Sequence, residues 1–175
     1  MNELDRIWND MLADAAANAR SSGRGDVADY LSLKSSNDEI RRQAVLWLFD
    51  SLISIAAEAG RHDPSITLER EEPHSFEFRG ANIVGSLVRV RQGVRSLTVE
   101  AGWPRTPSDG FIRGNAMAVA RVLHFGMKRS DADLLLVRHD DEKGPLWFAE
   151  STAGTRSEFR VEELLRHFAI FLGGP

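Results

Sequence analysis

The sequence predicts an α+β fold, with helices in the first third of the chain, a mainly antiparallel sheet after them and a helix at the C-terminal end. Apolar residues recur every three to four positions up to about residue 60 and every second position afterwards. Seven short strand candidates then follow one another across short turns, which favours antiparallel pairing in a sheet of about six to seven strands. The 175 residues are expected to form one domain, with a helical part over 1–60, the sheet over 65–150 and a C-terminal helical segment over 158–172.

Two helices are predicted before residue 35. Apolar residues at three- and four-residue spacing give residues 2–20 one apolar face, so this segment is expected to be an amphipathic helix. The Ser-Ser-Gly-Arg-Gly stretch at 21–25 breaks the pattern and is typical of a turn or a loose linker. A second, short helix is expected over about 26–33.

A start signal for a third helix lies at Ser36. Glu39 follows three residues later and an apolar run begins after it, which is the pattern of a capping box. The helix is expected to run to about Ala59 and to stop at Gly60. Its apolar residues cover more than one face, which indicates a central helix that packs against the sheet.

The first strands are predicted where the apolar period changes to two. Residues 66–68 alternate apolar and polar side chains, and residues 76–78 do the same. Pro73 lies between these runs and is expected to end the first one, because proline has no backbone N–H to donate to a neighbouring strand.

A hairpin is predicted over residues 87–100, turning at Gln92-Gly93, because a two-residue connection that contains glycine is a strong hairpin signal. In that register Val88 faces Leu97. The arginines of the first strand then lie on the opposite face: Arg89 and Arg91.

The remaining elements are predicted from similar patterns. Gly102–Gly110 contains two prolines and reads as a loop. Further strands are expected at 117–126, 133–139 and 146–150, and a final helix over about 161–172.

Charge is distributed unevenly along the chain, whose net charge is −4. Residues 1–78 carry a net charge of −7, residues 79–129 of +7 and residues 130–175 of −4, and eight of the nine basic residues in the middle segment are arginines. Arginine is preferred where planar, two-point contact with phosphate or carboxylate matters. The predicted function is therefore a non-enzymatic binding or interaction module for an anionic ligand or an acidic protein partner. The expected binding residues lie on the arginine-bearing sheet face and in the 102–110 loop: Arg89, Arg91, Arg95, Trp103, Arg105, Arg113 and Arg121.

Plainer interpretations of the same residues stay open. The acidic helices can lie against the basic sheet and neutralise it, or the arginines can be the solvated face of an antiparallel sheet. Nucleic acid is a less favoured ligand, because the acidic chain as a whole would repel a polyanion at long range. Trp103 is either an exposed contact residue beside Arg105 or the side chain that holds its loop to the core.

No catalytic motif is evident. The histidines form none of the closely spaced pairs of a zinc site, and neither a phosphate-binding loop nor a nucleophile elbow occurs. The alternative function is a metal-dependent hydrolase or nuclease that uses the His139–Glu142 turn, where hard oxygen ligands are concentrated. The plainer interpretation of this turn is a charged hairpin end, and no cofactor or bound metal is expected.

The composition excludes several classes of site. Because the chain has no cysteine, it contains no disulfide, thiolate metal site or cysteine nucleophile. Its first residues are acidic rather than basic, and no apolar run is long enough to span a bilayer, so a cytoplasmic location without membrane contact is expected. The first helix, set apart by residues 21–25, is a candidate surface for association of two copies of the chain.

Overall fold

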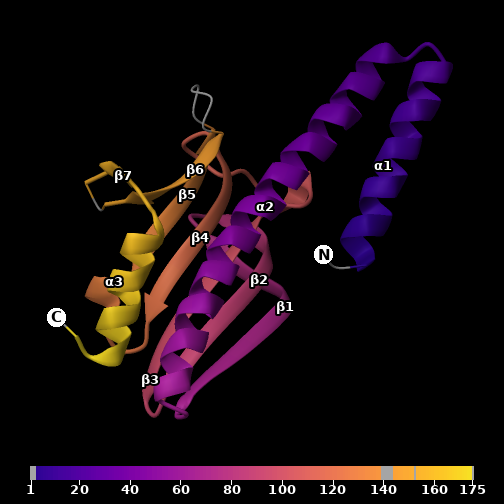
Figure 1. The fold of residues 1–175 in the computed structure, drawn as a ribbon. Coiled ribbons are helices and arrows are strands. Elements are labelled where there is room, and N and C mark those ends of the chain that lie inside the picture. The colour runs from indigo at the N-terminus through magenta and orange to yellow at the C-terminus, as the bar shows by residue number, and fades with distance from the viewer. Residues whose placement is uncertain (1–2, 139–143, 152, 175) are drawn as a thin grey trace. The chain divides into compact units, whose positions relative to one another are not determined.

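The computed structural model describes residues 3–138, 144–151 and 153–174, and the chain forms two compact units that meet in sequence at Arg42 and Gln43. The first unit is a helical hairpin of α1 (Glu3–Ser21) and the first part of α2 (Gly25–His62) (Figure 1). Small and apolar side chains are buried within it at helical spacing: Leu12, Ala16, Ala19 and Ala28. No helix of the described residues is both long and apolar enough to cross a membrane.

The predicted break before Ser36 is wrong, because α2 is one continuous helix of 38 residues. The polar residues around Ser36 carry a capping signal, but ion pairs at helical spacing bridge the same segment. Asp38 lies 3.6 Å from the Lys34 ammonium and 2.7 Å from the Arg41 guanidinium. Such pairs stabilise a helix across the position where the local signal would start a new one. The helix also passes through Gly60, the expected stop, and ends at His62.

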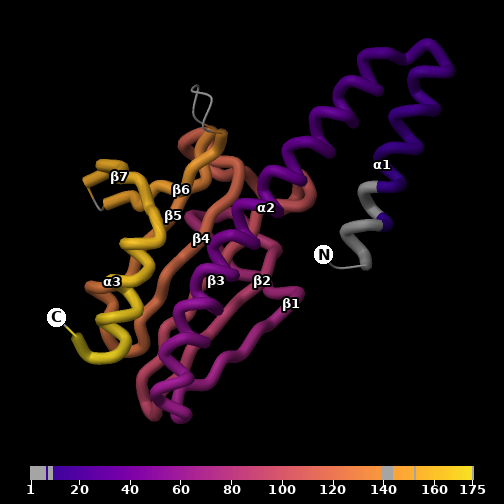
Figure 2. Tube along the Cα trace, in the orientation of Figure 1, coloured from indigo at the N-terminus to yellow at the C-terminus, as the bar shows by residue number. Residues whose placement is uncertain are grey.

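The second unit confirms the α+β prediction. Its antiparallel sheet has seven strands whose spatial order follows the chain, so that the colours of Figure 2 succeed one another across it. The strands are β1 (Ile66–Phe78), β2 (Ala81–Gln92), β3 (Arg95–Trp103), β4 (Ala116–His124), β5 (Ala132–Arg138), β6 (Pro145–Glu150) and β7 (Arg156–Glu158). Two short 3₁₀ turns, η1 (Pro107–Asp109) and η2 (Lys128–Ser130), interrupt the connections, and α3 (Val161–Leu172) follows the sheet.

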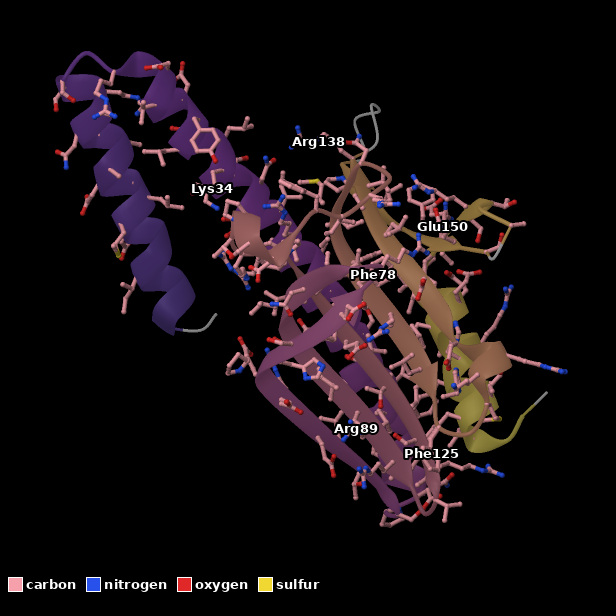
Figure 3. All side chains as sticks on the ribbon, turned by 180° about the vertical axis from the view of Figure 1, so that it is seen from behind. Lys34, Phe78, Arg89, Phe125, Arg138 and Glu150 are labelled. Atoms are coloured by element: carbon pink, nitrogen blue, oxygen red, sulfur yellow. The ribbon has the colours of Figure 1, made fainter. Side chains whose placement is uncertain are left out.

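One face of the sheet is covered by α3 and by the part of α2 from Gln43 onward (Figure 1). The main core lies between these helices and the sheet, with Leu48, Phe49 and Leu52 from α2 and Leu164, Phe168 and Phe171 from α3. The indole of Trp147 on β6 donates a hydrogen bond of 3.1 Å to the Ala44 carbonyl of α2. Neither α3 nor the part of α2 from Gln43 onward covers the opposite face, which we call the open face and which holds the polar side chains discussed below (Figure 3).

The hairpin prediction is correct in its faces and wrong in its register. Val88 pairs with Val99 rather than with Leu97, and the turn falls on Gly93-Val94. This shift of two residues keeps every side chain on its predicted face, because the side chains of a strand alternate with a period of two. Val88 and Val90 are fully buried towards the helices, so the alternate residues project onto the open face.

Two further expectations about strands are corrected. Pro73 does not end a strand, because β1 continues through it with a shift of register between Glu71 and His74. Proline is tolerated there because β1 is an edge strand, on which one side of the backbone has no pairing partner. The seventh strand is β7, a three-residue strand that the sequence pattern does not reveal.

The sheet bends at a pair of facing glycines. A Cβ atom on Gly85 of β2 would lie 1.9 Å from the Ala101 carbonyl oxygen, and one on Gly102 of β3 would lie 2.6 Å from the Val84 oxygen. Beyond this contact the tip of the β1–β2 hairpin folds over part of the open face. Its apolar side chains form a second, smaller core with β4 and β5: Phe76, Phe78, Ala81, Ile83, Val119 and Leu135.

Candidate functional site

A pocket of about 520 Å³ lies on the part of the open face that the hairpin tip leaves uncovered. The β2–β3 hairpin and the end of β4 form it, and we call it the arginine pocket. Figure 3 shows two of its residues, Arg89 and Phe125, at the same end of the sheet. The residues that matter for its chemistry are Arg89, Arg91, Val94, Arg95, Thr98, Leu123 and Phe125.

Strand alternation places two of these arginines side by side. Arg89 and Arg91 are two positions apart on β2, so both project onto the open face and their Cα atoms lie about 7 Å apart. Arg95 begins β3 directly after the turn and also lines the pocket, but its side chain lies on the face of buried Leu97 and its guanidinium is at the end of α3. Two of the seven predicted binding residues, Arg89 and Arg91, therefore bring their guanidinium groups together on the open face.

The pocket holds more positive than negative charge. Arg89 and Arg91 share one carboxylate, that of Glu69 on β1, whose Oε2 atom lies 3.5 Å from Nη1 of Arg89 and 3.6 Å from Nε of Arg91. The Glu69 side chain is 53% exposed, so water screens these pairs strongly. The Arg89 Nε also donates to the Thr98 hydroxyl at 3.2 Å, which orients the guanidinium group.

Arg95 has a neutral partner in place of an acid. Its Nη1 donates a hydrogen bond of 2.6 Å to the Leu172 carbonyl at the C-terminal end of α3. That carbonyl lies on the helix-covered side of the sheet, so the open face holds the guanidinium groups of Arg89 and Arg91 against the single carboxylate of Glu69, an excess of one positive charge. An open pocket with this excess and with several N–H donors is chemically suited to an anion.

Arg121 lies outside the pocket in a separate cluster. Its Nε donates to Oε1 of Glu100 at 2.6 Å, and Nε2 of His74 lies 2.8 Å from Oε2 of the same carboxylate. The Glu100 side chain is only 6% exposed, and the guanidinium of Arg121 also lies 5.1 Å from the centre of the Phe76 ring. Because a buried acid neutralises Arg121, this residue holds strands together on the open face.

The predicted loop residues are also separate from the pocket. Trp103 ends β3 and is 5% exposed, so its indole belongs to the core and is not offered to a partner. Arg105 places its guanidinium 3.9 Å from the centre of the Trp103 ring, and Arg113 is exposed. Asp109 orders this loop through hydrogen bonds from Asn82, Thr106 and the Arg105 amide, which lower the pKa of its carboxyl to about 2.

Several residues of the pocket region were not among the predicted site residues. Glu69 on β1 lies directly opposite Arg89 on β2. This pairing can be recognised only when the register of the two strands is known. Phe125 follows β4 and was recognisable only as an aromatic residue within the basic segment. Thr98 is buried, and its role as an acceptor for Arg89 depends on cross-strand pairing.

The acids that neutralise arginines on the open face come from the sheet itself. Glu69 and Glu100 fill this role beside the pocket, and Arg79 at the β1–β2 turn binds both Asp133 on β5, at 3.0 Å, and Glu150 on β6. Hydrogen bonding from Arg79 lowers the pKa of Glu150 below its usual value. One of the plainer interpretations placed the neutralising acids on the helices, whereas the pairs named here join strand to strand.

The predicted metal turn, His139–Glu142, falls outside the residues that the structure describes. Within the described parts of the chain, no group of three or more histidine, aspartate or glutamate side chains is arranged to hold a metal ion.

Comparisons with protein-family models, with curated proteins and with solved structures find no match to this chain.

Proposed function

We propose that this chain is a binding module that takes the anionic group of a ligand into the arginine pocket. The observation that carries the proposal is that Arg89 and Arg91 share a single, half-exposed carboxylate while the pocket beside them is open. Two guanidinium groups on one strand face present paired N–H donors, the arrangement that favours two-point contact with an oxyanion. No catalytic group is needed for this activity.

The test uses inorganic phosphate as the probe, titrated at low ionic strength and followed by NMR shifts of backbone amides. Phosphate is expected to shift amides of the β2–β3 hairpin. The double variant Arg89→Gln/Arg91→Gln should weaken binding at least tenfold, because each charge-assisted hydrogen bond contributes about 1.5 to 3 kcal/mol. Arg113→Gln is the matched control, since this arginine is exposed and lies outside the pocket, and it should leave the affinity unchanged.

Glu69→Gln gives a second test in the opposite direction. Removing the acid that competes with the ligand for Arg89 and Arg91 should increase phosphate affinity several-fold. If these residues only stabilised the sheet, the variant would lower stability without improving binding. Phosphate affinity that is the same in the Glu69 and double-arginine variants would contradict the proposal.

A second candidate function is association of two copies of the chain through the helical hairpin. The observation that favours it is a set of large apolar side chains that stay exposed on these two helices, each at 47% or more: Ile7, Met11, Tyr30 and Leu33. Exposed apolar groups gathered in one small unit mark interaction surfaces more often than isolated ones do.

A further inference from the structure

The arginine pocket also has an apolar side. The binding of a simple anion does not require it. Phe125 is 74% exposed and Val94 is 88% exposed, and both line the pocket together with the half-buried Leu123. A large apolar side chain stabilises the fold when it is buried. Such side chains that stay exposed beside cations therefore indicate an interaction surface. The apolar side is therefore suited to contact with a ligand.

The backbone of Phe125 is held beside the pocket. Its amide donates a hydrogen bond of 3.0 Å to the Ser96 carbonyl on β3, although β4 itself ends one residue earlier. The next residue, Gly126, has a φ of +77° and turns the chain away from the sheet. The residue that carries the aromatic ring is thus hydrogen-bonded to β3, one of the strands that form the pocket.

The size of the pocket also exceeds what a small anion needs. A volume of about 520 Å³ lies within the range of roughly 300 to 1,000 Å³ that holds drug-sized ligands. Water takes up about 30 Å³ per molecule in the liquid, and a tetrahedral oxyanion fills the volume of only a few waters. Most of the pocket would remain open around inorganic phosphate or sulfate.

The two guanidinium groups on the open face select among organic anions. Arg89 and Arg91 share only the half-exposed carboxylate of Glu69, whereas the Arg95 guanidinium lies at the end of α3. A phosphate monoester has three terminal oxygens that can accept from both guanidinium groups, whereas one bidentate arginine already occupies the two oxygens of a carboxylate. The phosphate monoester therefore uses the donors of both arginines more fully.

We infer that the ligand is a phosphate monoester that also carries an aromatic ring, as aryl phosphates and nucleoside monophosphates do. Its phosphate binds Arg89 and Arg91, and its ring lies against Phe125. This inference rests on the proposed anion-binding function and adds the ligand class. Base–aromatic stacking contributes about 1 to 3 kcal/mol, so the ring should improve affinity roughly five-fold or more over inorganic phosphate.

The test compares four probes by calorimetric titration of the full chain at low ionic strength: inorganic phosphate, phenyl phosphate, adenosine monophosphate and benzoate. Phenyl phosphate and adenosine monophosphate should bind more tightly than inorganic phosphate, and benzoate more weakly than phenyl phosphate. Phe125→Ala should remove the advantage of the ring and leave inorganic phosphate affinity unchanged. Phe125→Trp should retain it, which separates loss of stacking from misfolding.

Phe111→Ala is the matched control, because Phe111 is 83% exposed and does not line the pocket. If the phosphates bind equally well and Phe125→Ala has no effect, the ligand class is overturned while anion binding stands. Benzoate binding as tight as that of phenyl phosphate would overturn the choice of phosphate. If none of the four probes binds, the proposed function itself fails.

Discussion

Glu100 is the residue on which the charged cluster of the open face depends. Its carboxylate accepts from Arg121 and contacts His74, and it is almost completely buried. Glu100→Gln should lower the free energy of unfolding by on the order of 2 to 3 kcal/mol, because it removes the buried charge that compensates the Arg121 guanidinium. Arg121 keeps 30% of its side chain exposed, which allows water to offset part of the loss.

Urea denaturation monitored by circular dichroism measures this change. Glu69→Gln is the matched control, because the Glu69 carboxylate also pairs with arginine but is 53% exposed. Exposed pairs typically contribute about 0 to 1 kcal/mol, so the control should change stability by no more than that. Equal effects in the two variants would show that burial does not distinguish these carboxylates.

Gly85 is the residue that the bend of the sheet requires. Gly85→Ala would place Cβ 1.9 Å from a backbone oxygen of β3. Because the contacted atom belongs to the strand backbone and not to a flexible side chain, it cannot move aside. The variant should lose several kcal/mol of stability, as overpacked or strained sites do. Gly60→Ala, in contrast, is expected to increase the stability of the same chain.

Gly60 lies near the end of α2 and has open space where Cβ would be built. Alanine there should stabilise the helix by up to about 1 kcal/mol, because glycine is the poorer helix former. Thermal unfolding of the two variants provides the comparison. Gly85→Ala unfolding at the temperature of the unmodified chain would contradict the close approach of β2 and β3.

At the scale of elements, α3 contacts the sheet through a pair of histidines. His124 on β4 and His167 on α3 place Nε2 and Nδ1 2.9 Å apart. Burial lowers the pKa of both imidazoles, and the neighbouring His124 lowers that of His167 further, to about 4. Asp131 opposes the lowering at both rings and Glu163 at His167, but burial outweighs them.

The pH dependence follows from the direction of these shifts. The unfolded chain binds protons at its histidines near pH 6.5, whereas the folded chain resists protonation until the pH is lower. The free energy of unfolding should therefore fall as the pH decreases from about 6.5 towards 4. His167→Phe should reduce this slope in urea titrations at several pH values, whereas His62→Gln, at an 82% exposed side chain, should leave it unchanged. An identical slope in His167→Phe would exclude the pair as its source.

Helices and strands were predictable where the apolar pattern of the sequence agrees with the tertiary structure. The change of period after Pro64 placed the helices and the sheet correctly, and α3 was found at its observed bounds. The errors occur where a local signal was outweighed by its surroundings. Ser36 signals a helix start inside a continuous helix, and Pro73 signals a strand end on an edge strand. The strand β7 is too short for a period to be visible, and pairing with β6 defines it.

At the scale of the whole molecule, the uneven charge marked one segment of the chain as basic but could not show which of its arginines lie together in space. The sequence grouped the arginines of residues 79–129 together. In the folded chain Arg89 and Arg91 lie together on the open face, the Arg95 guanidinium lies at the end of α3, and Arg121 is paired with buried Glu100. Which arginine meets an acid depends on the register and bend of the sheet, and neither is encoded in charge counts along the chain.

The helical hairpin leads to a prediction about the whole molecule. If its exposed apolar side chains mediate association, the chain should have the mass of a dimer in light scattering at micromolar concentration. Met11→Asp/Leu33→Asp should reduce this to the mass of a monomer, because charges placed at the centre of an apolar contact must lose their hydration without gaining a partner. Leu165→Asp is the control, since Leu165 is 48% exposed on α3, outside the hairpin. A monomeric mass for the unmodified chain, or a dimer that survives the double substitution, would reject the hairpin as an interface and leave the arginine pocket as the recognition site proposed for this fold.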